Sequence, residues 1–278
     1  MFDSVAKKKL IFVSGKGGVG KTYIASHLAL YFSQKNEKTL LIETSPLGQL
    51  GFFFGVDLKI DDGIDLSDHL KIINVTSRGN FQTYLETLSS SLKLIQPILK
   101  NRIVMSLIDA IPGLAEAMLL GRLYYHATHH YDHVIFDAPA FGHFLSMMTT
   151  PDAIIESKIG GPIADQVMTV QNFLTSKDCA TILVGQPEEL VISEMLDFIP
   201  KLQAAKSPKI DVLCLNRVIA DPVTSFLLER STREAAQIKN LEMQTTQELW
   251  TVDDVGFWQP PVRDLASFLS HMRCARIL

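Results

Sequence analysis

Short apolar runs recur along this chain, separated by longer stretches in which apolar residues fall at helical spacing. Runs of this kind predict buried strands when turn residues bound them. We place the strands at residues 9–13, 39–43, 72–76, 133–137, 180–184 and 210–215. Helices are predicted over 21–33, 188–205 and 222–239 and, with breaks near Pro97 and 111–113, through most of 81–130.

The order of these elements predicts the fold class. Strands that alternate with helices are typical of right-handed parallel crossovers, so we expect an α/β protein with a twisted, mostly parallel sheet and helices on both faces. A length of 278 residues suits one large domain, and we predict a single domain over 1–278 with a helical subdomain at about 80–130. The irregular segment after the second strand carries Phe52, Phe53 and Phe54, which we expect to be buried.

Composition argues against several classes of protein. With 47% hydrophobic and 20% charged residues the chain can bury a core, unlike a disordered protein. The formal net charge of −4 gives no general attraction to nucleic acid or anionic membranes. We therefore expect no nucleic-acid partner and interpret Lys7–Lys9 as solvating the start of the first strand. The amphipathic stretch 265–276 is a weak candidate for a membrane foot, because only two arginines and no lysine accompany it.

Three widely separated cysteines form no CxxC pair. This favours a reducing cytoplasm over a disulfide framework or a closed zinc site. We therefore expect a cytoplasmic protein.

The residues between the first strand and the following helix carry the clearest chemical signal. They match the phosphate-binding pattern GxxxxGK[ST] in the required strand–loop–helix context and are Gly15, Lys16, Gly17, Gly18, Val19, Gly20, Lys21 and Thr22. The glycines let backbone N–H groups surround phosphate oxygens, Lys21 can reach the β- and γ-phosphates, and Thr22 can bind Mg²⁺. Lys16 is an additional lysine that an ordinary phosphate loop does not need.

With that additional lysine, the string GKGGVGKT resembles the loop of the deviant Walker A (SIMIBI-class) P-loop ATPases. The resemblance implies a homodimer in which Lys16 reaches the nucleotide of the partner subunit. There it would add positive charge at the transferred phosphoryl group, as an arginine finger does. The same resemblance implies ATP and ADP as ligands and Mg²⁺ as the cofactor.

Two further motifs indicate a branch of this class. Asp137 ends a hydrophobic strand, where a carboxylate can hold Mg²⁺ through water beside the loop. From Asp137 to His143, the string DAPAFGH is similar to the DTAPTGH switch of the arsenical pump ATPase ArsA and the tail-anchored-protein targeting ATPases. The segment IPGLAEA at 111–117 also resembles the PGxxEA segment of that branch. The chain thus resembles the ArsA and targeting-ATPase branch.

Two later residues are candidates for contact with the nucleotide base. Asn216 follows the strand at 210–215, and the resemblance implies that it reads adenine, since an amide can donate and accept against the polar edge of the base. A turn asparagine at a strand end is the alternative. Pro261 lies in PPVR, which resembles the late loop that flanks adenine in the branch.

The segment after the second strand departs from the branch. The targeting ATPases have TDPAH there, with an aspartate that orients the attacking water, whereas this chain has ETSPLG with Ser45 at that position. A hydroxyl cannot act as a carboxylate does near neutral pH. Glu43, two residues earlier, is a partial substitute or, alternatively, only a solvated or Mg²⁺-shell carboxylate.

Two side-chain patterns have competing interpretations. Histidines at helical spacing could form a metal site or simply favour a helix end, with the last of them already in a strand; they are His126, His129, His130 and His133. Methionines could line a client groove or pack in the core; they are Met105, Met118, Met147, Met148 and Met168.

These observations lead to one function and one alternative. We expect a Mg²⁺-ATP-binding homodimer that hydrolyses ATP slowly and uses nucleotide state to open or close a helical surface for a protein client or regulatory partner. The catalytic candidates are Lys16, Lys21, Glu43 and Ser45, and the metal candidates are Thr22 and Asp137. The alternative is a non-hydrolysing, nucleotide-dependent scaffold or regulator in which Ser45 marks lost catalysis.

Overall fold

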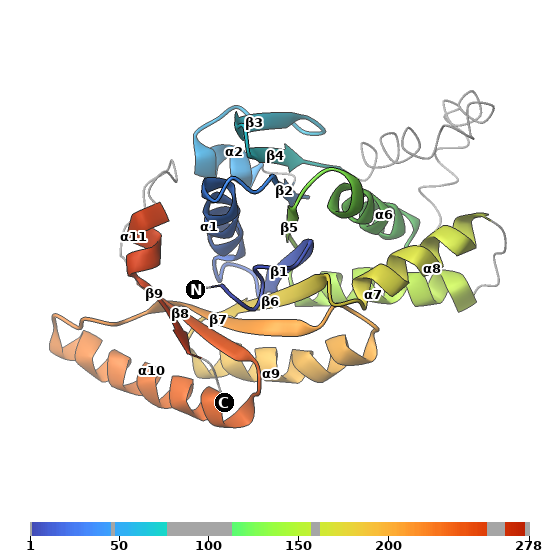
Figure 1. The fold of residues 1–278 in the computed structure, drawn as a ribbon. Coiled ribbons are helices and arrows are strands. Elements are labelled where there is room, and N and C mark those ends of the chain that lie inside the picture. Colours follow the sequence, from blue (N-terminus) through green and yellow to red (C-terminus); the bar gives the residue numbers. More distant parts are fainter. Residues whose placement is uncertain (1, 46–47, 77–112, 157–161, 255–264, 276–278) are drawn as a thin grey trace.

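The computed structural model of the protein describes residues 2–45, 48–76, 113–156, 162–254 and 265–275 (Figure 1). The strands are β1 Leu10–Gly15, β2 Thr39–Glu43, β3 Gly63–Ser67, β4 Leu70–Asn74, β5 His133–Asp137, β6 Cys179–Gly185, β7 Ile210–Val218, β8 Glu248–Asp253 and β9 Met272–Ala275. The helices are α1 Lys21–Gln34, α2 Gln49–Phe54, α6 Leu114–His129, α7 Phe141–Glu156, α8 Pro162–Leu174, α9 Glu189–Ala204, α10 Ser225–Gln244 and α11 Leu265–Ser270.

The described strands form one sheet in the order β3-β4-β2-β5-β1-β6-β7-β8-β9. Every neighbouring pair from β4 to β8 is parallel, and only the edge strands β3 and β9 run antiparallel to their neighbours. The mostly parallel α/β sheet predicted from the sequence is therefore confirmed. Because β1 lies in the middle, the loop that follows it opens at the centre of the carboxyl edge, where α/β proteins bind ligands.

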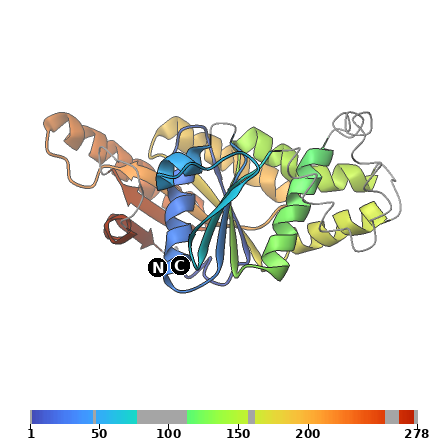
Figure 2. The same ribbon diagram turned by 90° about the horizontal axis from the view of Figure 1, so that it is seen from above.

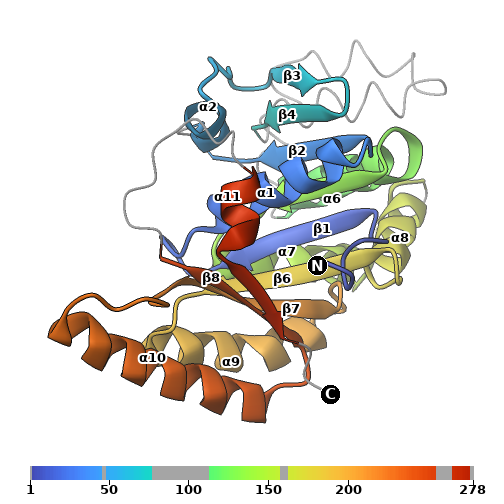
Figure 3. The same cartoon turned by 60° about the vertical axis from the view of Figure 1, so that its left-hand side comes forward.

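Two hydrophobic clusters lie on opposite faces of the sheet, because successive residues of a strand point to opposite sides. In β1, Leu10 and Phe12 belong to the cluster beneath α6, α7 and α9, whereas Ile11 and Val13 belong to the cluster beneath α1, α2 and α11. All four side chains are fully buried. Helices thus cover both faces of the sheet (Figures 1 and 3).

The predicted strands are all present, but among the described elements the sequence pattern missed three strands and three helices. The strands β3, β8 and β9 were not predicted, nor were α2, α7 and α8. Figure 2 shows that α10 reaches outward beyond the sheet, and only Glu234 and Leu241 of this helix are buried. The predicted helical subdomain at about 80–130 lies largely outside the described residues, and its described part is α6.

Three local expectations need correction. Phe52 is 64% exposed and Phe53 is half-buried, whereas Phe54 is buried, because residues two positions apart in a helix point to nearly opposite sides. The stretch 265–276 is not one amphipathic helix: α11 ends at Ser270 and the chain continues as β9, which pairs with β8. Lys8 is not simply solvated, since its Nζ lies 3.1 Å from Oδ1 of Asp211.

In the described part of the chain, we find no helix with the length and apolar character of a bilayer span.

We expect Phe12→Ala to lower the free energy of unfolding by about 3–5 kcal/mol, because it leaves a cavity in the core. The Phe12 ring packs against Phe136 and Phe144, with centroids 6.0 and 5.6 Å away. Phe52→Ala is the matched control and should change the free energy by less than about 0.5 kcal/mol, since the ring is exposed. Urea unfolding of both variants measures the difference, and equal effects would contradict the packing described here.

Candidate functional site

The loop between β1 and α1 has the backbone geometry of a phosphate cradle. Gly18 and Gly20 have φ angles of +80° and +98°, which residues with a Cβ rarely adopt. A Cβ on Gly20 would also lie 2.2 Å from Nδ2 of Asn216, and one on Gly15 would lie 2.1 Å from the carbonyl oxygen of Val184 in β6. The fold of the loop therefore requires glycine at these positions.

The two lysines of the loop have different surroundings. Lys21 donates to the carbonyl oxygen of Lys16 at 3.2 Å, and burial lowers its pKa, although the charge of Asp137 acts in the opposite direction. The Lys16 side chain instead forms an ion pair in which Nζ lies 2.9 Å from Oε1 of Glu194 on α9. Sequence reasoning missed Glu194, because a contact between residues so far apart in the chain leaves no local pattern.

Thr22, in the first turn of α1, faces the end of β5. Its hydroxyl donates to Oδ2 of Asp137 at 2.5 Å, and Oε1 of Gln49 lies 2.9 Å from the same hydroxyl oxygen. The other carboxylate oxygen of Asp137, Oδ1, is buried and has no hydrogen-bond partner in the described structure. Burial raises the pKa of Asp137 to about 6, against the effects of the Thr22 hydrogen bond and the Lys21 charge.

Glu43 lies beside Asp137, because β2 pairs with β5 in the register that puts the two residues opposite each other. The Glu43 side chain is buried, and the backbone N–H of Leu50 donates to its Oε1 at 3.1 Å. Its Oε2 is buried and has no partner within the described residues. Burial raises the pKa of Glu43 to about 7, and the charge of Asp137 acts in the same direction. Glu43 is therefore not a solvated carboxylate.

This set of oxygen atoms fits a hard divalent cation. Hydroxyl and carboxylate oxygens are the ligands that Mg²⁺ prefers, and in nucleotide sites it completes its shell with phosphate oxygens and water. Buried carboxylate oxygens without partners, as on Asp137 and Glu43, are costly unless a cation or a proton compensates them. No group of three or more His, Cys, Asp or Glu side chains in the described ranges is arranged to hold a metal by itself.

Asn216 contacts the phosphate loop from β7. It is buried, and its Nδ2 donates to the carbonyl oxygen of Val19 at 2.9 Å. The next residue, Arg217, has a φ of +63° and lies at an irregularity in the pairing of β7 with β8. Asn216 thus anchors the end of the loop, a contact that the sequence motif did not indicate. Pro261, the other candidate for base contact, lies outside the described residues.

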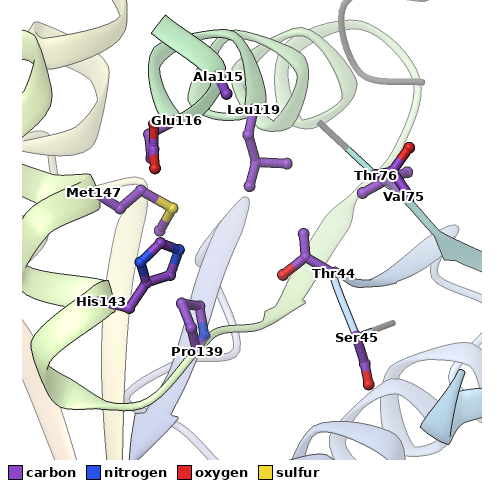
Figure 4. A pocket seen from close by; sticks show the side chains of 10 residues that line it. All are labelled: Thr44, Ser45, Val75, Thr76, Ala115, Glu116, Leu119, Pro139, His143 and Met147. Atoms are coloured by element: carbon purple, nitrogen blue, oxygen red, sulfur yellow. The ribbon is translucent and has the colours of Figure 1, made fainter. Parts of the chain in front are cut away.

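Ser45 lines a cavity of about 250 Å³ at the carboxyl ends of β2, β4 and β5 (Figure 4). Residues after β2, β4 and β5 form this cavity with the starts of α6 and α7, and they are Thr44, Ser45, Val75, Thr76, Ala115, Glu116, Leu119, Pro139, His143 and Met147. In Figure 4 the Ser45 side chain points away from His143 and Glu116, which lie together on the far side. The carbonyl oxygen of Ser45 accepts a hydrogen bond from Nδ2 of Asn74 at 2.9 Å.

The histidine and methionine patterns have structural explanations. His133 lies in β5, as expected, where its ring stacks on Phe32 at a centroid distance of 3.9 Å and Nε2 lies 3.1 Å from Oε2 of Glu37. His126 and His129 lie in the last turn of α6. Among the methionines, three are buried in the core, Met168 is 42% exposed, and Met105 lies outside the described residues; the buried ones are Met118, Met147 and Met148.

The GxxxxGK[ST] loop after the central strand β1, with its lysine and threonine beside an acidic residue at the end of the neighbouring strand β5, is typical of P-loop nucleotide-binding proteins. A comparison with protein families identifies the family: the model of the Anion-transporting ATPase family matches residues 8–159, more than half of the chain. The protein belongs to this family and is a P-loop ATPase, as its resemblance to the ArsA branch implied.

Several relatives are similar over different lengths. ATPase ASNA1 homolog 2 of Paramecium tetraurelia is 29% identical over 257 residues, which cover 83% of this chain and 72% of the relative. ATPase BagA of Mycobacterium tuberculosis is 27% identical, over 76% of this chain and 65% of the relative. ATPase GET3 of Mycosarcoma maydis is 31% identical over 148 residues, 52% of this chain and 43% of its own length.

Gly20→Ala should destabilise the protein in the absence of nucleotide by about 1–3 kcal/mol, because the φ angle is left-handed and the added Cβ meets Asn216. Gly17→Ala is the control within the same loop, since a Cβ there would have no neighbour within 4 Å. Thermal unfolding compares the two. Similar melting temperatures for both variants would mean that the contact between Asn216 and the loop does not shape it.

The buried carboxylate of Glu43 gives a second prediction, on the pH dependence of stability. Its pKa in the folded protein is about 7, compared with 4.5 for an ordinary glutamate. Between these values the folded state binds the proton more tightly than the unfolded state, so stability falls as the pH rises from about 4.5 to about 7. Glu43→Gln should remove a fall on the order of 2–3 kcal/mol.

Urea unfolding of the nucleotide-free protein at pH 5 and pH 7.5 measures this fall. Glu189→Gln makes the same chemical change at an exposed position of α9 and should leave the difference between the two pH values as it is in the unchanged protein. If Glu43→Gln also leaves that difference unchanged, burial does not raise the Glu43 pKa.

Proposed function

We propose that this protein is a Mg²⁺-ATP-dependent switch that closes as a homodimer, hydrolyses ATP slowly and presents a helical surface to a protein partner. The observation that carries the proposal is the combination of an intact phosphate loop with two buried, partly unsatisfied carboxylates. The family resemblance adds that Ser45 stands where the targeting ATPases have the water-orienting aspartate. The residues expected to bind the phosphates and Mg²⁺ are thus present, whereas the residue expected to orient the attacking water is replaced.

Nucleotide binding would depend on groups from three strands of the sheet, β1, β5 and β7, or from the residues that follow them. The loop N–H groups and Lys21 would contact the phosphates, and Thr22 with Asp137 would hold Mg²⁺. When bound, Mg²⁺ neutralises negative charge on the phosphate oxygens. Asn216 would contact adenine with its carbonyl oxygen while its amide nitrogen stays bonded to Val19, at 2.9 Å.

Hydrolysis would be slow because the polar groups near the phosphates are poorly suited to activating water. The Ser45 hydroxyl can accept and donate a hydrogen bond, but it does not take a proton at neutral pH. Glu43, with its raised pKa, can hold or release a proton near pH 7 and is the better candidate for orienting water. Its burial and its hydrogen bond from Leu50 restrict where it can reach.

The cavity beside Ser45 would link the nucleotide to the partner surface. Its walls combine the segments after β2 and β5, which adjoin the phosphates, with the first turn of α6 through Ala115, Glu116 and Leu119. A shift of either segment on ATP binding would therefore change the contacts of α6. The client or regulatory partner would bind the helical region that α6 adjoins.

A non-hydrolysing scaffold or regulator is the second candidate function, and Ser45 is the observation that favours it. In that case ATP would only stabilise the closed dimer. Both candidates suit a cytoplasmic location, since Cys179, Cys214 and Cys274 are all free thiols and thiols remain reduced in that compartment.

Lys16→Ala should abolish or strongly reduce ATP-dependent dimerisation, because we propose that Lys16 acts on the nucleotide of the partner subunit. ATP should still bind, since Lys21 and the loop backbone remain. Light scattering with and without a non-hydrolysable ATP analogue measures the oligomeric state. Lys201→Ala, which removes an exposed lysine from the far end of α9, is the control. Identical oligomeric states for the Lys16 variant and the unchanged protein in every nucleotide condition would refute the cross-dimer role.

Ser45→Asp should accelerate phosphate release by on the order of 100-fold without tightening ATP binding, because a carboxylate there would act on water in the transition state. The unchanged protein should turn over well below the enzyme median of about 10 per second, and Glu43→Gln should lower its rate further. Ser67→Asp on β3 adds the same charge at the edge of the sheet as a control. Brisk turnover by the unchanged protein that Ser45→Asp slows would show that another residue orients the water.

A further inference from the structure

The ion pair between Lys16 and Glu194 joins the signature lysine to its own subunit. Nζ of Lys16 and Oε1 of Glu194 are 2.9 Å apart, and the two side chains are 40% and 41% exposed. One ammonium group cannot pair closely with this carboxylate and, at the same time, reach phosphates on another subunit. The two positions of Lys16 therefore exclude each other.

The helix that carries Glu194 is fixed to the sheet. Three side chains of α9 are buried in the core: Val191, Met195 and Phe198. Val191 and Met195 lie beside Gly185 at the end of β6. Glu194 is thus held on a rigid element beside the phosphate loop. Only the two side chains, and not the backbone of the helix, must then be ordered to form the pair.

The same helix contacts the segment that follows Asp137. The rings of Phe141, at the start of α7, and Phe198 are stacked at a centroid distance of 4.3 Å, and Phe198 lies one helical turn after Glu194. The hydroxyl of Ser14 in β1 also donates to the carbonyl oxygen of Pro139 at 2.8 Å. A rearrangement after Asp137 would therefore act on α9 and on the start of the loop together.

We propose that Glu194 is a positioning residue that retains Lys16 within its own subunit, and that this pair must open before Lys16 can reach the nucleotide of a second copy of the chain. The proposal rests on the dimeric function proposed above. The exchange is feasible, since a half-exposed ion pair is weak and the phosphates of ATP carry more negative charge than one carboxylate. The stack of Phe141 on Phe198 provides a route by which ATP binding opens the pair.

Glu194→Gln tests the proposal directly. It should lower the ATP concentration needed for half-maximal dimerisation by about two- to five-fold at low ionic strength, the effect expected from losing an exposed ion pair. The effect should shrink as salt is added, because exposed charges are screened. Sedimentation velocity with a non-hydrolysable ATP analogue measures dimerisation, and calorimetry should show unchanged ADP affinity.

Two further variants separate a specific pair from a general effect of charge. Asp197→Asn removes an exposed carboxylate from the same helix and should leave dimerisation unchanged. In the Lys16→Ala background, Glu194→Gln should leave the dimer fraction unchanged at every ATP concentration, because the carboxylate acts only through Lys16.

The outcomes distinguish this inference from the proposed function. If Lys16→Ala impairs dimerisation but Glu194→Gln has no effect, Glu194 does not retain the lysine, and the dimeric switch stands. If Glu194→Gln promotes dimerisation equally with and without Lys16, its effect is general electrostatics and the inference is wrong. If Lys16→Ala dimerises normally, the cross-dimer role fails, and the proposal about Glu194 fails with it.

Discussion

One short hydrogen bond, from the Thr22 hydroxyl to Asp137 at 2.5 Å, connects the parts of this site that must act together. Thr22 opens the helix after the phosphate loop, and Asp137 ends the strand that leads into α7. The bond is buried, so its loss would leave polar groups without water to replace it. The phosphate loop and the segment after Asp137 are thus in direct contact at this point.

The electrostatics of the site follow from the same burial. Glu43 and Asp137 are neighbours across parallel strands, each has a carboxylate oxygen without a partner among the described residues, and each has a raised pKa. Two buried carboxylates repel each other unless a proton or a cation intervenes. Their arrangement is unfavourable for stability and favourable for binding a divalent cation with a nucleotide, as in other sites where function costs stability.

Helix α9 contacts both the phosphate loop and the start of α7, which belong to two separate sequence motifs. It pairs with the phosphate loop through Glu194 and Lys16, and it stacks on the start of α7 through Phe198 and Phe141. The cavity beside Ser45 extends the connection toward α6. These packed helices form a continuous set of contacts from the phosphate loop to α6.

The sequence by itself determined the parallel α/β fold and the position of the phosphate loop, because these depend on short-range patterns of glycine and apolar residues. Thr22 and Asp137 as metal ligands stay a prediction, although the structure places the two side chains within hydrogen-bond distance. It did not indicate the edge strands β3 and β9 or the exposure of Phe52. It also missed the contacts of Glu194 with Lys16 and of Asn216 with Val19. Residues remote in the chain make these contacts, and only the tertiary structure decides which of them meet. Burial, which raises the pKa of Glu43, likewise depends on every element packed around it.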